Sequence, residues 1–392
     1  MDLIYFDNAA TSWPKPDVMI KAMLDFNKNI GANPGRSGHR LSIEAARILF
    51  YVRESMASLI NADEPDTIIF TRNATEGINI ILHGLLKPGD HVITSSMEHN
   101  SVMRPLHALE AKGIGLTVVP CSPEGFIDPE DVSIAIRKNT KLIITTHASN
   151  VTGTILPVSD LAKIARKNEI VYCVDAAQTA GSLPIDVIKD QIDIMVFTGH
   201  KSLYGPQGTG GLYIRQGLET LIEPLEQGGT GSRSESEEHP DFMPDRFESG
   251  TPNTIGIAGL GAGVGFVLEK GVEQIRNKEV AITGLFLDGL SSIKGVKVYG
   301  GMDPYKRTAV VSFTMENIMP SEVSYILDKE YNIFSRPGLQ CAPSAHRTIG
   351  SFPEGTVRFS FGIFTTGDEI KTAIHAIENI AHDGLKKSFG RR

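Results

Sequence analysis

The sequence predicts an α/β protein with a large, mostly parallel sheet of seven strands and a smaller C-terminal α+β domain. Two observations carry this prediction. Apolar, β-rich runs alternate with helix-like segments between residues 67 and 215, and continuous apolar strands separated by helices form a parallel sheet that is covered on both faces. From residue 254 onward the order changes to two helical runs, shorter strands and a last helix.

Seven apolar runs are expected to form the large sheet. They are TIIFT (67–71), HVITSS (91–96), LTVVP (116–120), KLIITTHAS (141–149), IVYCVDAA (170–177), IDIMVFTG (192–199) and GGLYIR (210–215). Helical patterns such as TEGINIILHGLL and PVSDLAKIARKN lie between most of them. Ligands of such sheets bind at the carboxyl ends of the strands, so the residues that follow each strand are the candidates for a site.

The rest of the chain suggests a division into domains. The polar, glycine-rich stretch 226–253 is expected to be a long loop, and strands in VKVYG, TAVVSF and TVRFSFG are expected in the small domain. The run GLGAGVGF resembles a dinucleotide fingerprint, but no βαβ unit surrounds it, so a packed helix is expected there. We expect an N-terminal segment 1–20 that contributes to the small domain, a large domain 21–250 and a small domain 251–392.

The composition excludes several classes of function. The 392 residues are 41% hydrophobic and 21% charged, as in globular proteins. A net charge of -8 argues against nucleic acid as a partner. No apolar stretch is long enough to span a membrane, no signal peptide is visible, and three cysteines do not suggest a disulfide framework. A reducing cytoplasm is the expected location.

Lys201 and Asp175 are the first candidates for a catalytic site. Lys201 follows the strand in FTGHKSLYG, and Asp175 ends the strand in VYCVDAAQ. Lys201 is either an ordinary solvated lysine or a Schiff-base former whose pKa burial would lower. Asp175 pairs either with backbone N–H groups or with a protonated ring nitrogen. A Schiff-base lysine and an acid that pairs with a pyridinium are the core requirement of pyridoxal 5'-phosphate (PLP) chemistry.

The stretch FTRNATEGIN (70–79) predicts a phosphate site. It has the pattern of a strand, a polar turn and the start of a helix, and helix N-termini bind phosphate. Thr75 either caps the helix in the ordinary way or helps to hold a cofactor phosphate. In the second case the N–H of Ala74 and a donor such as Thr198 or His200 would complete the site.

Four further residues are candidates because of their position. His99 follows a strand, where it could stack on a cofactor ring or be a hydrogen-bonded structural histidine. Asn150 and Gln178 follow two other strands, where they could contact the ring hydroxyl and the Schiff-base region. Arg358 in VRFSFG could hold a substrate carboxylate with its planar fork, or form a surface ion pair.

Cys341 differs from the other two cysteines, which lie at apolar runs and are expected to be buried strand residues. The stretch SRPGLQCAPSAH places Cys341 on a loop near Arg336, His346 and Arg347. Nearby positive charge favours the thiolate, which is the reactive form of cysteine. A metal site at Cys341 and His346 is a weaker alternative, because two ligands are too few for structural zinc, and no metal is expected.

Taken in order along the chain, these stretches resemble the class V aminotransferase family of PLP enzymes and, within it, the cysteine desulfurases. The matching motifs are YFDNAATSWPKP, GANPGRSGHRLS, NATEGIN, EHNS, ASNVTGTILP, VDAAQTAG, TGHKSLYGPQGTGGLYIR, ESGTPN, RPGLQCAP and VRFSFGIFTT. They cover nearly the whole chain, and the resemblance implies the PLP-dependent transferase fold of type I. NAT in place of the usual GTT, and Thr198 in place of a common serine, still offer N–H and hydroxyl donors.

The resemblance also implies a role for each candidate. Lys201 would form the Schiff base, Asp175 would pair with the pyridine nitrogen, and His99 would stack on the ring. The ring substituent and the Schiff-base region would be contacted by Asn150 and Gln178. The phosphate would be held by Ala74, Thr75, Thr198 and His200, and by Thr251 from the other subunit of a homodimer with shared active sites. The substrate carboxylate would bind Arg358, with Asn33 and His39 near the substrate entrance.

Cys341 falls where these desulfurases keep their nucleophilic cysteine, after an R-x-G-x-x-C-A pattern. Its short interval to Arg358 is similar to that of the short-loop, Suf-type desulfurases and selenocysteine lyases. The implied reaction converts L-cysteine to L-alanine and leaves a persulfide on Cys341, to be passed to an acceptor protein or thiol. Iron–sulfur assembly, tRNA thiolation and sulfur catabolism are all compatible uses.

Three alternatives to this reaction remain. The first is selenocysteine lyase activity. The second is another class V activity (aminotransferase, lyase or epimerase) in which Cys341 is an incidental thiol. The third is a sulfur carrier or scaffold without catalysis, against which the joint presence of Lys201, Asp175 and His99 argues.

Overall fold

The large sheet has seven strands in the order β2-β8-β7-β6-β5-β3-β4. This computed structural model describes residues 3–35 and 37–389. The strands are β2 (Ile68–Thr71), β3 (His91–Ser95), β4 (Gly115–Val119), β5 (Thr140–Thr146), β6 (Val171–Asp175), β7 (Ile194–Thr198) and β8 (Gly210–Ile214). β8 is antiparallel to both of its neighbours, and the pairs from β7 to β4 are parallel. The mostly parallel sheet is confirmed, and each strand begins within two residues of its expected start.

Helices cover both faces of this sheet. α2 (Arg40–Ile60), α6 (Val158–Lys167) and α7 (Thr254–Lys270) lie on one face, and α3 (Ala74–Leu85) and α4 (Asn100–Glu110) lie on the other. Successive residues of a strand point to opposite faces, so Ile68 and Phe70 of β2 pack with the first group and Ile69 packs with the second. Both faces of the sheet are therefore buried, so a ligand can bind only at the ends of the strands.

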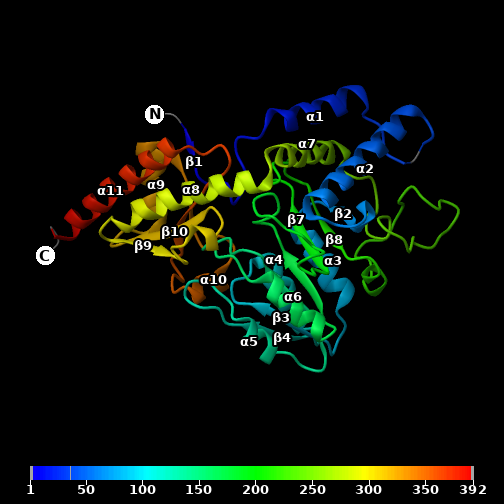
Figure 1. The fold of residues 1–392 in the computed structure, drawn as a ribbon, viewed down its shortest axis with the longest axis horizontal. Coiled ribbons are helices and arrows are strands. Elements are labelled where there is room, and N and C mark those ends of the chain that lie inside the picture. Colours follow the sequence, from blue (N-terminus) through cyan, green and yellow to red (C-terminus); the bar gives the residue numbers. More distant parts are fainter. Residues whose placement is uncertain (1–2, 36, 390–392) are drawn as a thin grey trace.

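The small domain is built on an antiparallel sheet in the order β12-β13-β10-β9. Its strands are β9 (Val296–Tyr299), β10 (Val310–Met315), β12 (Arg336–Gly338) and β13 (Thr356–Ser360). α8 (Val272–Ser291), α9 (Pro320–Tyr331) and α11 (Gly367–Phe389) lie against this sheet (Figure 1). Their residues Phe286, Leu327 and Ile377 belong to the core of the small domain. The expected strands and the last helix are confirmed, whereas β12 was not expected.

The N-terminal segment reaches the small domain. β1 (Ile4–Tyr5) pairs in parallel with β11 (Ile333–Phe334), and the N–H of Ser360 donates to the carbonyl oxygen of Phe6 at 2.8 Å. The chain then crosses to α1 (Asp17–Asn29), which lies beside α7. This segment thus touches the elements of both domains.

The glycine-rich run from Thr254 is the packed helix α7, as expected. Its residues Ile257, Leu260 and Val264 belong to the core on the large sheet, although α7 follows the expected boundary at residue 250. The domain limits stay a prediction. No single described helix is long and apolar enough to cross a membrane, while α7 and α8 together, bent by 78°, pass that test by length and composition alone.

The remaining elements are short connections. They are α5 (Pro129–Ile134), α10 (Pro343–Thr348) and the 3-10 turns Pro65–Thr67, Leu218–Leu221 and Pro304–Lys306. The stretch 226–253 contains no helix or strand, as expected for a long loop. α10 lies directly after Cys341, where the sequence suggested only loop.

Candidate active site

The carboxyl ends of four neighbouring strands carry the polar residues of the candidate site. Asp175 ends β6 and pairs in register with Val196 of β7. Thr198, the last residue of β7, lies two residues beyond Val196 toward the same edge. His99 follows β3, and Asn150 follows β5. Because these strands are parallel, the sheet brings their ends together at one edge.

Lys201 lies in the loop after β7, near both acidic and basic side chains. Burial lowers the pKa of Lys201 to about 8. The carboxylate of Asp175 opposes this shift, while the charges of Arg358 and Arg336 add to it. The lowered pKa makes the neutral amine, the nucleophilic form, accessible near neutral pH.

Asp175 is a buried carboxyl group next to this lysine. Burial raises the pKa of Asp175 above its ordinary value, and the N–H of Ala177 and the charge of Lys201 oppose that shift. The Ala177 N–H donates to Oδ1 of Asp175 at 3.0 Å. The sequence suggested two kinds of partner for Asp175, a backbone N–H or a protonated ring nitrogen. The structure shows the backbone N–H of Ala177, and a cationic ring nitrogen would add a second partner.

His99 caps helix α4, and its ring is neutral. Its Nδ1 accepts the N–H of Ser101 at 3.0 Å and lies 2.9 Å from the hydroxyl of Ser101. Burial, followed by the charges of Lys201 and Arg336, lowers the pKa of His99 to about 4. A neutral imidazole that Ser101 holds in place is suited to lie against a flat ring.

The helix expected to bind phosphate begins as predicted, but its cap differs. Asn73, not Thr75, is the N-cap of α3, and its side chain accepts the N–H of Glu76 at 3.0 Å. The hydroxyl of Thr75 lies 2.7 Å from that of Ser101, which joins the starts of α3 and α4. Gly210 lets β8 lie close to the start of α3, because a Cβ there would lie 2.8 Å from the Cα of Asn73.

Two buried polar atoms at this edge support the fit of a phosphorylated cofactor. Thr198 Oγ1 and His200 Nδ1 have no hydrogen-bond partner among the described residues. Buried polar groups normally have a hydrogen-bond partner, so a bound ligand is the expected partner of both atoms. Burial, followed by the charges of Lys201 and Lys15, lowers the pKa of His200 to about 4, so its ring is neutral. A phosphate at the start of α3 is a suitable partner for these two groups.

Cys341 lies beside this edge, although it is far away in sequence. Its carbonyl oxygen accepts the N–H of Asn100, the residue after His99, at 2.8 Å. Nη2 of Arg336 lies 3.4 Å from its sulfur. Cys341 is exposed, whereas Cys121 is half-buried just after β4 and Cys173 is buried in β6.

The backbone at this cysteine is strained. Gln340 and Cys341 have φ values of +41° and +59°, a left-handed conformation that non-glycine residues rarely adopt. Such strained positions concentrate at functional sites. The amide of Gln340 donates to the carbonyl oxygens of Arg336 and Thr356 at 3.2 and 3.1 Å, which holds the turn in place.

Of the three residues that the sequence places near Cys341, His346 does not supply a positive charge. His346 is buried, and its two ring nitrogens bind Ser351 Oγ at 2.7 Å and Gln340 Oε1 at 2.8 Å. Burial lowers its pKa to about 4, so the ring is neutral at pH 7. These contacts also leave neither nitrogen free for a metal, and no group of three metal-binding side chains occurs in the described part of the chain. Arg347 lies over the ring of Phe352 at 4.2 Å instead.

Arg358 is buried and held by two partners. Its Nη2 donates to Asp7 Oδ1 at 2.7 Å, and its Nη1 donates to the carbonyl oxygen of Asn150 at 3.0 Å. Its Nε has no hydrogen-bond partner among the described residues. Arg358 also pairs across the sheet with Arg336, so both guanidinium groups come from the same level of the small domain.

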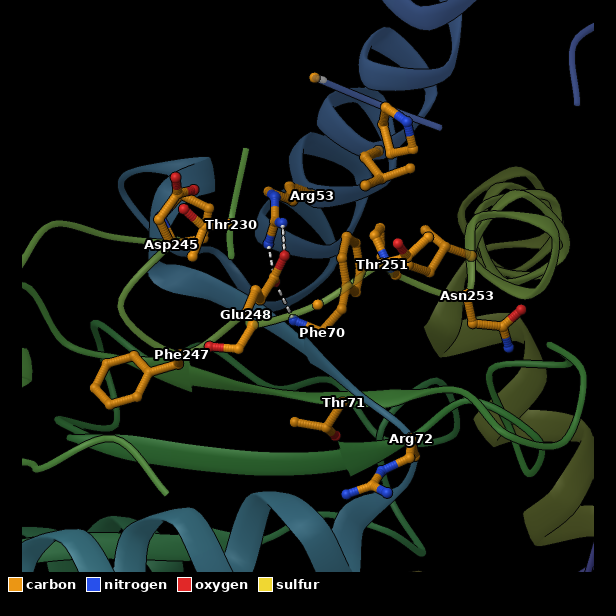
Figure 2. A pocket seen from close by; sticks show the side chains of 18 of the residues that line it. Arg53, Phe70, Thr71, Arg72, Thr230, Asp245, Phe247, Glu248, Thr251 and Asn253 are labelled. Atoms are coloured by element: carbon orange, nitrogen blue, oxygen red, sulfur yellow. Dashed lines mark hydrogen bonds and ion pairs between the residues drawn. The ribbon is translucent and has the colours of Figure 1, made fainter. Parts of the chain in front are cut away.

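Three expected site residues lie elsewhere on this chain. Thr251 lines a cavity of about 520 Å³ between α2, β2 and the loop 226–253 (Figure 2). Arg53 and Glu248 form an ion pair on its wall, with an Nη1 to Oε1 distance of 2.8 Å. His39 caps α2 by accepting the N–H of Ser42, whose hydroxyl donates to the carbonyl oxygen of Asn33 at 2.8 Å. Within the described part of the chain, no hydrogen bond or ion pair joins these three residues to Lys201 or Cys341.

Gln178 and Glu98 bind backbone groups near the candidate site. The side chain of Gln178 donates to the carbonyl oxygen of Ala9 at 3.2 Å. Glu98 was missed in the sequence, although it directly precedes His99. It is fully buried, accepts the N–H of Thr146 at 3.0 and 2.9 Å and the hydroxyl of Ser95, and so fixes the turn that carries His99. Its position between the end of β3 and the candidate His99 is the sequence feature that could have identified it.

Known proteins resemble this chain over nearly its whole length. The profile of the family described as aminotransferase class-V matches residues 4–372. A probable cysteine desulfurase of Methanothermobacter thermautotrophicus is 36% identical over 388 residues, which are 98% of this chain and 96% of that protein. The cysteine desulfurase of Serratia proteamaculans is 34% identical over 96% of this chain and 93% of its own length.

The fold agrees with this likeness. The apo structure of the cysteine desulfurase from Thermococcus onnurineus NA1 matches with a TM-score of 0.92 at 34% identity, over 97% of this chain and 95% of that one. The expected type I fold of PLP-dependent transferases is thereby confirmed. The chain belongs to the class-V aminotransferase family.

Proposed function

We propose that the protein is a PLP-dependent cysteine desulfurase that converts L-cysteine to L-alanine and forms a persulfide on Cys341. The observation that carries the proposal is the position of Cys341. Its carbonyl oxygen binds the N–H that follows His99, at the edge of the sheet where Lys201 and Asp175 lie. The relatives and the structural neighbour named above carry the name cysteine desulfurase.

The described residues fit PLP at this edge. Asp175 would pair with the ring nitrogen, His99 would lie against the ring, and Lys201 would bind the cofactor covalently. Asn150 and Gln178 would contact the ring substituent and the Schiff-base region. The phosphate would be held by Ala74, Thr75, Thr198 and His200. When bound, PLP supplies an electron sink for the charge that forms on the α-carbon of the substrate.

The small domain would hold the substrate. The Nε of Arg358, which has no hydrogen-bond partner among the described residues, would donate to the carboxylate of L-cysteine, while Asp7 and the carbonyl oxygen of Asn150 fix the guanidinium. Lys201, whose lowered pKa makes a neutral amine available, would remove the α-proton as a general base. A fixed carboxylate and a nearby base orient the β-carbon and its sulfur toward Cys341.

Cys341 would act as the sulfur acceptor. Its thiolate, beside the guanidinium of Arg336, attacks the sulfur of L-cysteine. A sulfur–sulfur bond forms while the bond between that sulfur and the β-carbon breaks. Protonation of the β-carbon, together with return of the proton that Lys201 removed from the α-carbon, gives alanine, and the persulfide stays on Cys341. A sulfur-acceptor protein or a free thiol then removes the outer sulfur, and a reducing compartment such as the cytoplasm would keep Cys341 as a thiol.

A homodimer with shared active sites belongs to this proposal. Thr251 is exposed beside the cavity of Figure 2 and would reach the cofactor phosphate of a second subunit, with Asn33 and His39 near the substrate entrance. Ile43, Phe50 and Tyr51 of α2 are 44%, 46% and 60% exposed on the same helix that lines this cavity. Exposed apolar groups of this kind mark surfaces that a partner covers.

Turnover with L-cysteine and a reductant tests the proposed reaction. Alanine and sulfide are measured together for the wild type, Cys341→Ser and the control Cys121→Ser, with bound PLP checked by absorbance. We expect equal amounts of both products from the wild type and the control, and loss of both from Cys341→Ser with PLP still bound. A Cys341→Ser variant as active as the wild type would contradict the role of Cys341. A wild type without sulfide release would redirect the search to aminotransferase, lyase or epimerase substrates.

A further inference from the structure

The N-terminal segment holds the backbone of Lys201. The carbonyl oxygen of His200 accepts hydrogen bonds from the N–H of Ser12 at 3.0 Å, from Thr11 Oγ1 at 3.1 Å and from Lys15 Nζ at 2.7 Å. The hydroxyl of Ser12 donates to the carbonyl oxygen of Lys201 at 2.8 Å. Both carbonyl groups that flank the Lys201 Cα are therefore bound by residues nearly 190 positions earlier in the chain.

The donor at Lys15 differs from the others because it carries a charge. Its ammonium group also donates to the hydroxyl of Ser12 at 2.8 Å, and that hydroxyl donates to the carbonyl oxygen of Lys201. Lys15 therefore binds the His200 carbonyl directly and supports the Lys201 carbonyl through Ser12. Lys15 is half-buried, and burial lowers its pKa to about 8, which leaves it mostly protonated at pH 7. Charge-assisted hydrogen bonds are about twice as strong as neutral ones, so Lys15 is the strongest single contact of this group.

The same segment is attached to the small domain. Asp7 pairs with Arg358 at 2.7 Å, and the N–H of Ala9 donates to Ser360 Oγ at 2.8 Å. The stretch 7–15 thus connects the arginine proposed to hold the substrate with the backbone of the proposed catalytic lysine. A shift of this stretch would change the distance between the two groups.

We propose that Lys15 is a positioning residue, whose ammonium group fixes the His200–Lys201 backbone so that the Lys201 side chain is aimed at the substrate α-carbon. The inference rests on the proposed function, because it concerns the geometry of that reaction. Among the described residues, the side chain of Lys15 donates to Ser12 and to the carbonyl oxygen of His200, and to no other candidate cofactor residue. Its loss should act on the chemical step, since displacement of a reacting group by about 1 Å lowers rates up to about a hundredfold, while the substrate carboxylate remains bound by Arg358.

The test compares Lys15→Met, Lys15→Arg and the control Lys21→Met, which alters an exposed lysine of α1. Hydrogen exchange of the segment 199–204 is measured in the cofactor-free and the PLP-loaded protein, and kcat and KM for L-cysteine are measured in the loaded enzyme. For Lys15→Met we expect exchange about tenfold faster in this segment, kcat about tenfold lower and KM within about twofold. Lys15→Arg keeps a charged donor and should recover most of both effects, and Lys21→Met should match the wild type.

The outcomes separate this inference from the proposed function. Exchange needs no turnover, so a wild type that releases no sulfide would contradict the proposed function alone, and the exchange data would still decide the role of Lys15. Wild-type exchange and kcat in Lys15→Met would overturn the inference, as would a loss of kcat that Lys15→Arg does not recover. If Lys15→Met fails to fold, Ser12→Ala, which removes the bond to the carbonyl oxygen of Lys201, must show the same local increase in exchange; unchanged exchange there overturns the inference.

Discussion

The side chain of Asn150 donates a 2.7 Å hydrogen bond from Nδ2 to the carbonyl oxygen of Gln340. Asn150 was expected to contact the cofactor ring, and Gln340 immediately precedes Cys341. The backbone carbonyl of Asn150 in turn accepts from Arg358. One residue at the carboxyl end of the large sheet therefore joins the cysteine loop and the proposed substrate arginine, both of which belong to the small domain.

Replacing Asn150 by Ala should loosen the Cys341 loop. Loss of this buried hydrogen bond costs about 1 kcal/mol, which corresponds to about fivefold more frequent opening of the loop. We expect alkylation of Cys341 by iodoacetamide in the cofactor-free protein to be about fivefold faster, measured by mass spectrometry of the peptide that contains Cys341. The peptide with Cys121 serves as the internal control, and an unchanged rate at Cys341 would show that the bond does not restrain the loop.

Arg336 and His346 should affect Cys341 differently. The guanidinium of Arg336 lies 3.4 Å from the sulfur, and positive charge beside a cysteine generally promotes its reaction as a thiolate. His346, by contrast, is neutral and bound to Gln340 and Ser351. Arg336→Gln should therefore slow alkylation of Cys341 at pH 7 without lowering stability. His346→Ala removes two buried hydrogen bonds and should lower the free energy of unfolding by about 2–3 kcal/mol. Slower alkylation at full stability in His346→Ala would contradict this assignment.

Arg358→Lys should weaken the binding of substrate. Lysine cannot reproduce the planar fork that serves Asp7, the Asn150 carbonyl and a carboxylate at once. A charge-assisted bond contributes about 1.5–3 kcal/mol, so KM for L-cysteine should rise about 10- to 100-fold. Steady-state kinetics measure this change, with Arg347→Lys as a surface control. Equal increases of KM in both variants would argue against a specific role for Arg358.

The sequence located the strand ends because continuous apolar runs and the residues that follow them are local features. Asp175, Lys201 and His99 were found in this way, and they lie at one edge because parallel strands align their ends. The bond between Asn150 and Gln340 was not predictable, since it joins residues separated by 190 positions. Such a contact depends on how the two domains meet, and no local pattern encodes it.

Errors near Cys341 have a physical cause as well. Pro337 and Gly338 favour a loop, yet they lie in β12, which is an edge strand. Proline is tolerated there because an edge strand has one side free of ladder hydrogen bonds. The charge of His346 was misjudged because burial, which lowers its pKa to about 4, follows from the packing of α10 and not from the residue type.

Glu279 on α8 should make stability fall as pH rises. This side chain is 4% exposed, and burial raises its pKa to about 8, against 4.5 in an unfolded chain. Its stabilising contribution is present in full below about pH 4.5 and is lost as pH rises toward 8, with a slope of at most about 1.4 kcal/mol per pH unit. Urea unfolding at pH 6 and pH 8 should show a smaller pH effect for Glu279→Gln than for the wild type. Glu273→Gln, on the exposed side of the same helix, should keep the wild-type slope, and an unaltered slope in Glu279→Gln would contradict the prediction.

Thr251 provides a test of whether subunits share their sites. Each single variant, Thr251→Ala and Lys201→Ala, should have low activity as a homodimer, the first through weaker phosphate binding and the second through loss of the base. When the two variants are mixed, refolded together and purified as heterodimers, the result depends on which site Thr251 serves. If Thr251 serves the other subunit, the site with an intact Lys201 receives an intact Thr251, and one functional site per dimer forms.

The expected outcome is therefore recovery to about half of the wild-type activity per dimer, since one of two sites is restored. If Thr251 acted within its own subunit, the site with Lys201 would carry the altered residue, and the mixture would stay at the mean of the two parents. Tagging the two variants differently and purifying through both tags ensures that only mixed dimers are assayed. If a confirmed heterodimer has only the mean activity of the two parents, the proposal that the subunits share their active sites is wrong. Thr251 would then be a residue that lines the cavity in Figure 2 and does not serve the other subunit.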